Sequence, residues 1–278
     1  ELLLRLSSAK AWGVPAELLT SEQVKEKLPY VNTDIILGGF LSPTAGVVDP
    51  LHAGTLMREH ADDLGSISMH ANVEVTGIEV TKGHVKGVQT DGGAIKTDTV
   101  VIACGVWSPR IARMAGATIP LTPMVHQLIS VGPIPIYEKT TGEIEYPVVR
   151  DMDVILYLRQ NGSDMEIGSY QHPPMHHSPN DIPSLQEASL SPTELPFTQD
   201  DFDSSMEDAL ELMPDVLSAD GVGIRHAING LMSLTPDGGP VVGETEVGGL
   251  WSCAAIWIKE APGFGRMCAE WMTHGTPE

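Results

Sequence analysis

The sequence predicts an α/β fold with a substantial antiparallel component, and three local patterns support this prediction. The first is a series of segments rich in Val, Ile and Thr, separated by glycine turns and typical of hairpin-connected strands: residues 67–80, 84–90 and 94–103. The second is Gly105, which follows the last of these strands and precedes a helix at 109–115, because strand, glycine turn and helix form half of an α/β crossover. The third is a pair of strands, 154–160 and 165–171, around an Asn-Gly turn.

Helix-start signals support the helices of the first 66 residues. Residues 2–12 have an amphipathic helical pattern. Thr20 and Gln23 predict a capping box that opens a short helix, because each side chain can bond the backbone of the other. Asp49, followed by a proline, opens a longer helix that runs to about Gly65.

The remaining elements come from apolar periodicity and turn residues. They are a buried strand at 35–41, a strand at 124–131, a helix at 199–213, a strand at 249–256, and a final helix that follows a glycine turn at 263–265. Six prolines between residues 171 and 197 predict a long irregular loop there.

The chain is strongly acidic. Its 278 residues contain 16 Lys and Arg against 37 Asp and Glu, a formal net charge of −21. Contacts with nucleic-acid phosphates, and attraction to anionic membranes, both depend on clustered Lys and Arg. We therefore expect neither nucleic acid nor a membrane as a partner.

Composition also indicates the size of the core and the cellular compartment. Hydrophobic residues make up 42% of the chain, enough for a core in one large or two ordinary domains. The three cysteines are widely spaced and form no Cys-x-x-Cys pair, so we expect a reducing compartment, the cytoplasm or, in a eukaryote, the mitochondrial matrix. The first residues resemble the middle of a helix rather than a signal peptide, and we expect the chain to be part of a larger protein.

Two kinds of catalytic site are not favoured by the motifs. The Gly-x-Ser-x-Gly nucleophile motif of many serine hydrolases does not occur. His172, His176 and His177 supply enough imidazole for a zinc site. They lie among prolines with no cysteine nearby, however, and the favoured interpretation is a solvated loop.

The glycine-rich segment near the end is more suggestive. A strand at 249–256, the run IWIKEAPGFG and a helix place backbone N–H groups at a helix N-terminus. Such groups suit an anion or an electron-rich ring carbonyl. A complete Gly-x-Gly-x-x-Gly fingerprint does not occur in the chain.

A series of motifs resembles a known family. In order they are AWGVPAELLTSEQVKEKLPYV, ILGGFLSPTAGVVDP, VTGIEV, VVIACGVWSPRIARMAG, IPLTPMVHQ, LYLRQ, GSYQH, INGLMSLTPDGGPVVGE and AIWIKEAPGFGRMCAEWM. Together they extend over essentially the whole chain. They resemble the dimethylglycine oxidase, dimethylglycine dehydrogenase and sarcosine dehydrogenase group of D-amino-acid-oxidase-like flavoproteins, and most of all its dimethylglycine oxidases.

The resemblance implies a partial FAD-binding, Rossmann-like domain interleaved with a substrate domain built on a mixed or antiparallel sheet. The implied segments are helical and strand elements at 1–66, part of the FAD domain at 67–118, the substrate domain at 119–240, and a return to the FAD domain at 241–278. The family's nucleotide fingerprint and covalent-flavin histidine precede this part of the fold, and its folate region follows it. We therefore expect the isolated chain to hold FAD weakly or not at all, and tetrahydrofolate to bind only through a downstream domain.

The resemblance also implies oxidation of an N-methyl glycine, with a hydride passing from the N-methyl carbon to the flavin. His126 and Tyr157 match positions on the substrate side of the flavin. A group that titrates near neutrality can hold the ammonium proton that must leave before the nitrogen lone pair reacts. We therefore interpret His126 and Tyr157 as catalytic candidates; two ordinary strand residues with hydrogen-bonded tips are the alternative.

Cofactor-contacting residues follow from the same resemblance. They are Val75 beside the adenosine, Gly105 at a close approach of the backbone, and Ile256, Trp257, Ile258 and Lys259 beside the isoalloxazine ring. Lys259 can place a positive charge near the N1–C2=O edge, which is negatively charged in the reduced flavin. A solvent-facing turn lysine is the alternative.

Two other functions remain open. A sister enzyme acting on another amine, such as glycine or a proline derivative, shares the fold, and a structural or interaction module needs no cofactor. In the catalytic case the electron acceptor is oxygen or an electron-transfer protein. Residues 160–224 contain 13 acidic and no basic residues. We interpret them as a solvated face rather than as an attractor of cationic amines.

Overall fold

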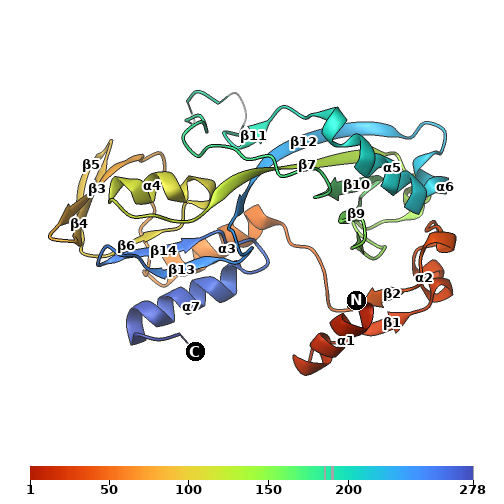
Figure 1. Cartoon of the computed structure of the whole chain (residues 1–278), viewed down its shortest axis with the longest axis horizontal. Coiled ribbons are helices and arrows are strands. Elements are labelled where there is room, and N and C mark those ends of the chain that lie inside the picture. Colours follow the sequence, from red (N-terminus) through yellow and green to blue (C-terminus); the bar gives the residue numbers. More distant parts are fainter. Residues whose placement is uncertain (185, 189–190, 278) are drawn as a thin grey trace. The chain divides into compact units, whose positions relative to one another are not determined.

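The computed structural model describes residues 1–184, 186–188 and 191–277, and the chain divides into two compact units (Figure 1). The first consists of Glu1–Val47, His126–Pro173 and Glu194–Gly230. The second consists of Val48–Val125, Pro174–Thr193 and Leu231–Glu278. The predicted α/β class with a large antiparallel component is confirmed by both.

The first unit is centred on a six-stranded sheet of order β11-β12-β7-β10-β9-β8. Its strands are β7 (Thr122–Gly132), β8 (Val149–Asp151), β9 (Leu156–Asn161), β10 (Asp164–Ser169), β11 (Glu194–Leu195) and β12 (Gly223–Leu234). β9 and β10 form the predicted hairpin, in which Asn161 pairs with Asp164 and Gly162 adopts φ 60°. Because β7 pairs with β10, and β8 with β9, the four strands form a continuous antiparallel ladder.

One face of this sheet is the core of the first unit. Leu156 and Leu158 of β9 alternate with outward-facing residues, as a strand period of two requires. The core face packs with α5 (Asp203–Leu212) and α6 (Pro214–Leu217), which lie beside the sheet in Figure 1. Ala209 of α5 is 0% exposed, whereas Glu207 and Glu211 are exposed. Glu207 and Glu211 therefore lie on the outer side of the helix, whereas Asp208 is half-buried.

The N-terminal elements of the first unit are α1 (Leu2–Ala11), β1 (Glu17–Leu19), α2 (Ser21–Lys27) and β2 (Gly39–Leu41). The capping box of Thr20 and Gln23 is present at α2. The buried strand expected over 35–41 is wrong in extent and in burial, because only β2 pairs with β1, its residues are half-buried, and Leu37 is 101% exposed. The side chain of Asn32 caps a 3₁₀ turn at Thr33–Ile35, so Ile35 belongs to this turn and not to a strand.

The second unit has two three-stranded sheets, β3-β4-β5 and β13-β14-β6. Its elements are α3 (Pro50–Asp63), β3 (Val75–Thr81), β4 (His84–Thr90), β5 (Gly93–Lys96), β6 (Val100–Ile102), α4 (Ser108–Met114), β13 (Val241–Glu244), β14 (Leu250–Ala254) and α7 (Ala261–His274). β6 runs parallel to β14, and Gly105 and α4 follow β6 as predicted. Asp49 caps α3 by accepting from the His52 N–H.

Three expected strands or turns of this unit are corrected. Residues 67–74 are not a strand, because Asn72 adopts φ 57° and interrupts the extended backbone before Val75. The segment 94–103 is two strands, because Thr97 bonds the backbone of Thr99 and turns the chain. The glycine turn at 263–265 is the first part of α7, since Pro262 fixes the first helical turn.

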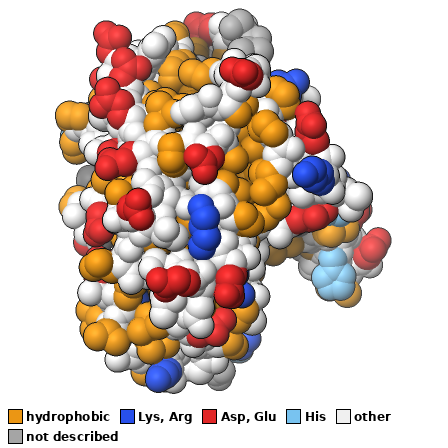
Figure 2. Space-filling view, turned by 90° about the vertical axis from the view of Figure 1, so that its right-hand side faces the viewer, with side chains coloured by type: hydrophobic (Ala, Val, Ile, Leu, Met, Phe, Trp, Pro, Cys, Tyr) orange, Lys and Arg blue, Asp and Glu red, His pale blue; other side chains and the backbone are white. Residues whose placement is uncertain are grey.

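Acidic side chains are scattered over the face shown in Figure 2, with apolar side chains between them. Among the residues that the structure describes, no helix is long and apolar enough to cross a membrane.

Candidate functional site

His126 and Tyr157 meet on the face of the sheet opposite the core of the first unit. His126 lies on β7 and Tyr157 on β9, two strands that are separated by β10. The His126 Nε2 and the Tyr157 Oη lie 2.7 Å apart, a short hydrogen bond. The two predicted catalytic candidates are thus brought into direct contact.

Gly168 of β10 allows this contact. It is the register partner of Tyr157, and the phenol passes directly over it. A Cβ at Gly168 would lie 2.1 Å from the Tyr157 Oη, far closer than real atoms approach. The motif GSYQH contained this glycine, but its role was not recognised from the sequence. The available signal was a glycine inside a strand, which often marks a close approach.

Tyr170 is a third member of the site that sequence reasoning missed. Its ring stacks on the His126 imidazole with centroids 4.2 Å apart and planes 16° apart. The Tyr170 N–H donates to the Ile155 carbonyl at 3.2 Å. Ile155 has φ 53°, a strained backbone for a β-branched residue. Such strain is held by surrounding structure and often occurs at functional sites.

The pair is neutral at physiological pH. Burial, and next the nearby His172 and Arg150, lower the pKa of His126 to about 4, while the Ser169 backbone opposes this shift. Burial also raises the pKa of the Tyr157 hydroxyl above its ordinary value. The buried Nδ1 of His126 makes no well-aligned hydrogen bond to any described residue. The site therefore presents an imidazole lone pair and a phenol O–H without a fixed charge.

Arg150 lies beside this neutral pair. It is the register partner of Tyr157 on β8, and its guanidinium carbon lies 5.8 Å from the centroid of the Tyr157 ring. The side chain is exposed, and no described carboxylate lies within 4.0 Å of it. Arg159, on the same face of β9, instead forms an ion pair with Glu166 at 2.5 Å.

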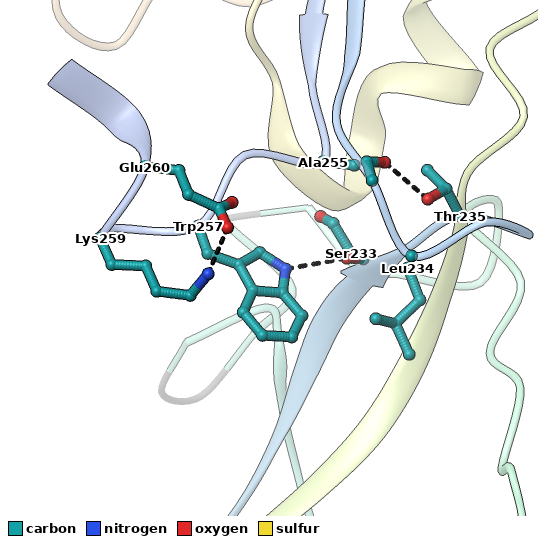
Figure 3. A pocket seen from close by; sticks show the side chains of 9 residues that line it. Ser233, Leu234, Thr235, Ala255, Trp257, Lys259 and Glu260 are labelled. Atoms are coloured by element: carbon teal, nitrogen blue, oxygen red, sulfur yellow. Dashed lines mark hydrogen bonds and ion pairs between the residues drawn. The ribbon is translucent and has the colours of Figure 1, made fainter. Parts of the chain in front are cut away.

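A second cluster lies within the second unit, where a cavity of about 60 Å³ follows β14 (Figure 3). The Trp257 Nε1–H donates to the Ser233 carbonyl at 3.2 Å, which fixes the indole. The Lys259 ammonium pairs with Glu260 and lies 5.5 Å from the Trp257 ring centroid. Ala255, which also lines the cavity, has φ 55°.

The other cofactor candidates lie apart from this cavity. Ile256 and Ile258 do not line it, and Ile258 is 52% exposed. Val75 begins β3 and is half-buried. Gly105 follows β6 with φ 51°, and a Cβ built there meets no atom within 4 Å. Open space beside a left-handed glycine fits a cofactor that approaches the backbone.

The three loop histidines do not form a metal centre in the part of the chain that the structure describes, where no group of three or more His, Cys, Asp or Glu is placed to hold an ion. His176 forms an isolated antiparallel bridge with Met124. The His172 Nδ1 lies 2.9 Å from the Pro173 carbonyl.

The fold resembles that of solved amino-acid oxidoreductases. An L-proline dehydrogenase from P. horikoshii is 26% identical and aligns with a TM-score of 0.81, over 98% of this chain and 68% of that chain. The FAD dependent oxidoreductase (DAO) family matches residues 1–271. The chain therefore belongs to this family, as the motifs indicated.

Two curated proteins are also similar to this chain over nearly its whole length. The chain is 31% identical to the 4-methylaminobutanoate oxidase (formaldehyde-forming) of Paenarthrobacter nicotinovorans, over 100% of this chain and 32% of that protein. It is 29% identical to the mitochondrial sarcosine dehydrogenase of Mus musculus, over 98% of this chain and 29% of that protein. The chain thus spans about a third of the length of these relatives.

Proposed function

We propose that the chain supplies the substrate side, and part of the cofactor side, of an FAD-dependent oxidoreductase that demethylates an N-methyl amino acid such as dimethylglycine or sarcosine. The hydrogen bond between His126 and Tyr157 is the observation that carries this proposal. The names of two relatives support the substrate class, since sarcosine and 4-methylaminobutanoate are both N-methyl amino acids.

Bound FAD supplies the two-electron acceptor of such a reaction. For the methyl C–H bond to lose a hydride, the amine nitrogen must contribute its lone pair to a new C=N bond, and therefore must first lose its proton. Burial lowers the pKa of His126 to about 4, so His126 does not hold this proton at neutral pH as expected from a group that titrates near neutrality. We propose instead that the proton leaves to solvent, that neutral His126 takes part through hydrogen bonds, and that the Tyr157 hydroxyl orients the imidazole through the 2.7 Å contact. Water then hydrolyses the iminium to formaldehyde and the demethylated amine, or the one-carbon unit passes to a folate carrier.

The residues of the second unit fit the cofactor in part. Lys259 supplies a cation near a fixed indole, which suits the negatively charged edge of a reduced flavin. Gly105 leaves the backbone open to a close approach. Ile256, Ile258 and Val75 supply apolar side chains, of which Ile258 is 52% exposed and Val75 is half-buried. We propose these residues as the flavin contacts of this chain.

Formaldehyde release tests the reaction directly. The full-length protein is incubated with dimethylglycine, sarcosine and proline under air and, separately, with an artificial electron acceptor. We expect one formaldehyde per molecule of N-methyl substrate oxidised, and a large loss of turnover in the His126→Gln variant. Oxidation of proline in preference to both N-methyl substrates would contradict the proposal.

That outcome would support a second candidate, the oxidation of a ring amine. The observation that favours this candidate is the TM-score of 0.81 with an L-proline dehydrogenase. The same His126–Tyr157 pair would then hydrogen-bond a secondary amine, and no formaldehyde would form.

A further inference from the structure

We propose that Cys253 and Cys268 form a redox-sensitive thiol pair, which a hydroperoxide oxidises to a disulfide that ties helix α7 to strand β14. Both residues belong to the second unit, and all three cysteines of the chain are free thiols in the structure. The bond would close a ring of backbone that contains Trp257 and Lys259. This inference concerns a modification site and does not depend on the proposed substrate.

The periodicity of β14 and α7 directs both cysteines to the interface between these two elements, which pack together (Figure 1). Leu250 of β14 is buried in the core with α4, so Trp251 and Cys253 face the opposite side of the sheet. Trp251 meets Trp271 of α7 edge to face, with ring centroids 5.8 Å apart. Cys268 precedes Trp271 by three residues and therefore lies on the same face of the helix.

Sulfur atoms contact one another at this interface. The Cys253 thiol donates a hydrogen bond to the Cys268 sulfur. The Cys268 thiol in turn donates to the Met272 Sδ, and these two sulfur atoms lie 3.8 Å apart. Burial, and next the charge and hydrogen bond of Cys268, raise the pKa of Cys253 to about 11. Cys253 therefore rests as a thiol in contact with the sulfur that it would join.

Exposure determines which thiol reacts first. Cys253 is half-buried, whereas Cys268 is only 4% exposed. A hydroperoxide therefore meets Cys253 before it can reach Cys268. Because the thiolate is the reactive form and is a minor species of Cys253 at neutral pH, we expect this first step to be slow.

The reaction takes two steps. The Cys253 sulfur loses its proton and attacks a peroxide oxygen, so that an S–O bond forms, the O–O bond breaks, and an alcohol or water leaves. The Cys268 sulfur then attacks the sulfenic acid at Cys253, loses its own proton, and expels water as the S–S bond forms. Two thiols lose two electrons in total, and the hydroperoxide is reduced to an alcohol and water.

Peptide mapping of the full-length protein tests the pair directly. The reduced protein is incubated with an excess of hydrogen peroxide, remaining thiols are alkylated in denaturant, and the protein is digested without a reductant. Trypsin cleaves after Lys259 and Arg266, so Cys253 and Cys268 fall on separate peptides unless a disulfide joins them. Mass spectrometry compares the wild type with Cys253→Ala, Cys268→Ala and the matched control Cys104→Ala, which removes an exposed thiol.

We expect the joined peptides in the wild type and in Cys104→Ala, and their separation by a reductant. In Cys268→Ala, Cys253 should stop at a sulfenic acid that dimedone traps. In Cys253→Ala, the buried Cys268 should stay reduced. A sulfinic acid at Cys253 beside a reduced Cys268 in the wild type would overturn the inference, as would two unmodified thiols under conditions that oxidise Cys104. Both of these outcomes are read from the wild type and do not depend on the folding of any variant.

Discussion

The two faces of the six-stranded sheet have the same strands but opposite physical characters. On the core face, Leu158 and Ile167 are 1% and 0% exposed and pack against helices. On the other face, His126, Tyr157 and Arg150 are polar and partly or fully exposed. Because side chains alternate along each strand, the residues that stabilise the fold lie on one face and the candidate catalytic residues lie on the other. Substitutions on the two faces are therefore expected to have different consequences.

The largest effect on stability is expected from the core face. Leu158→Ala leaves a cavity among Ile129, Ile167 and α5, and should lower the free energy of unfolding by about 2–5 kcal/mol. Urea unfolding measures this change. Activity should fall only in proportion to the fraction of molecules that are folded. If each folded Leu158→Ala molecule were less active than a wild-type molecule, the two faces would not have separate roles.

The second effect is expected at Gly168, where an added side chain would point toward Tyr157. Gly168→Ala places a Cβ in the Tyr157 ring and should cost about 3 kcal/mol, while it also displaces the hydroxyl from His126. Gly230→Ala is the matched control, because Gly230 also lies in a strand of this sheet and a Cβ there meets no atom within 4 Å. Equal melting temperatures of the two variants would show that the phenol does not cross Gly168.

The third prediction concerns pH. The pKa of His126 is lowered from 6.5 to about 4 by burial, so between these values the unfolded chain binds a proton that the folded chain excludes. Stability from neutral His126 is thus present above pH 6.5 and is lost as the pH falls toward 4. Between pH 7 and 5 the wild type should lose about 2 kcal/mol more than His126→Gln. Parallel pH profiles of unfolding would contradict the neutral assignment.

The smallest effect is expected for the phenol hydroxyl. Tyr157→Phe removes one hydrogen bond at 2.7 Å but keeps the ring, and should cost about 1 kcal/mol of stability. Tyr170→Phe is the control, since its ring stacks on the His126 imidazole at 4.2 Å. A destabilisation of Tyr157→Phe above about 3 kcal/mol would mean that the hydroxyl has a structural role beyond this bond.

Local signals could be predicted from the sequence because they depend on neighbouring residues. The capping box of Thr20 and Gln23 and the Asn-Gly hairpin at 161–162 each involve a few consecutive residues. The failures have local causes too. Asn72 and Thr97 interrupt expected strands through their own backbone conformation or hydrogen bonds, which apolar and β-branched periodicity does not show.

The site itself was predictable only in part. His126 and Tyr157 came from family motifs, whereas Gly168, Tyr170 and Arg150 depend on the register of three strands. A shift of one residue would move every side chain to the other face. The Asn-Gly turn at 161–162 fixes the register of β9 and β10, but no short-range pattern aligns β7 and β8 with them. The positions of His126 and Arg150 relative to Tyr157 therefore emerge only from the structure.

Catalysis by the linked His126–Tyr157 pair is tested most directly by a double-mutant cycle. Formaldehyde release from sarcosine or dimethylglycine is measured for His126→Gln, Tyr157→Phe and the double variant in the full-length protein. If the 2.7 Å contact makes the two residues act as a unit, each single change should lower kcat/KM by about a hundredfold and the double change should lower it no further. Two losses that multiply in the double variant would show that His126 and Tyr157 act independently, and would contradict the account.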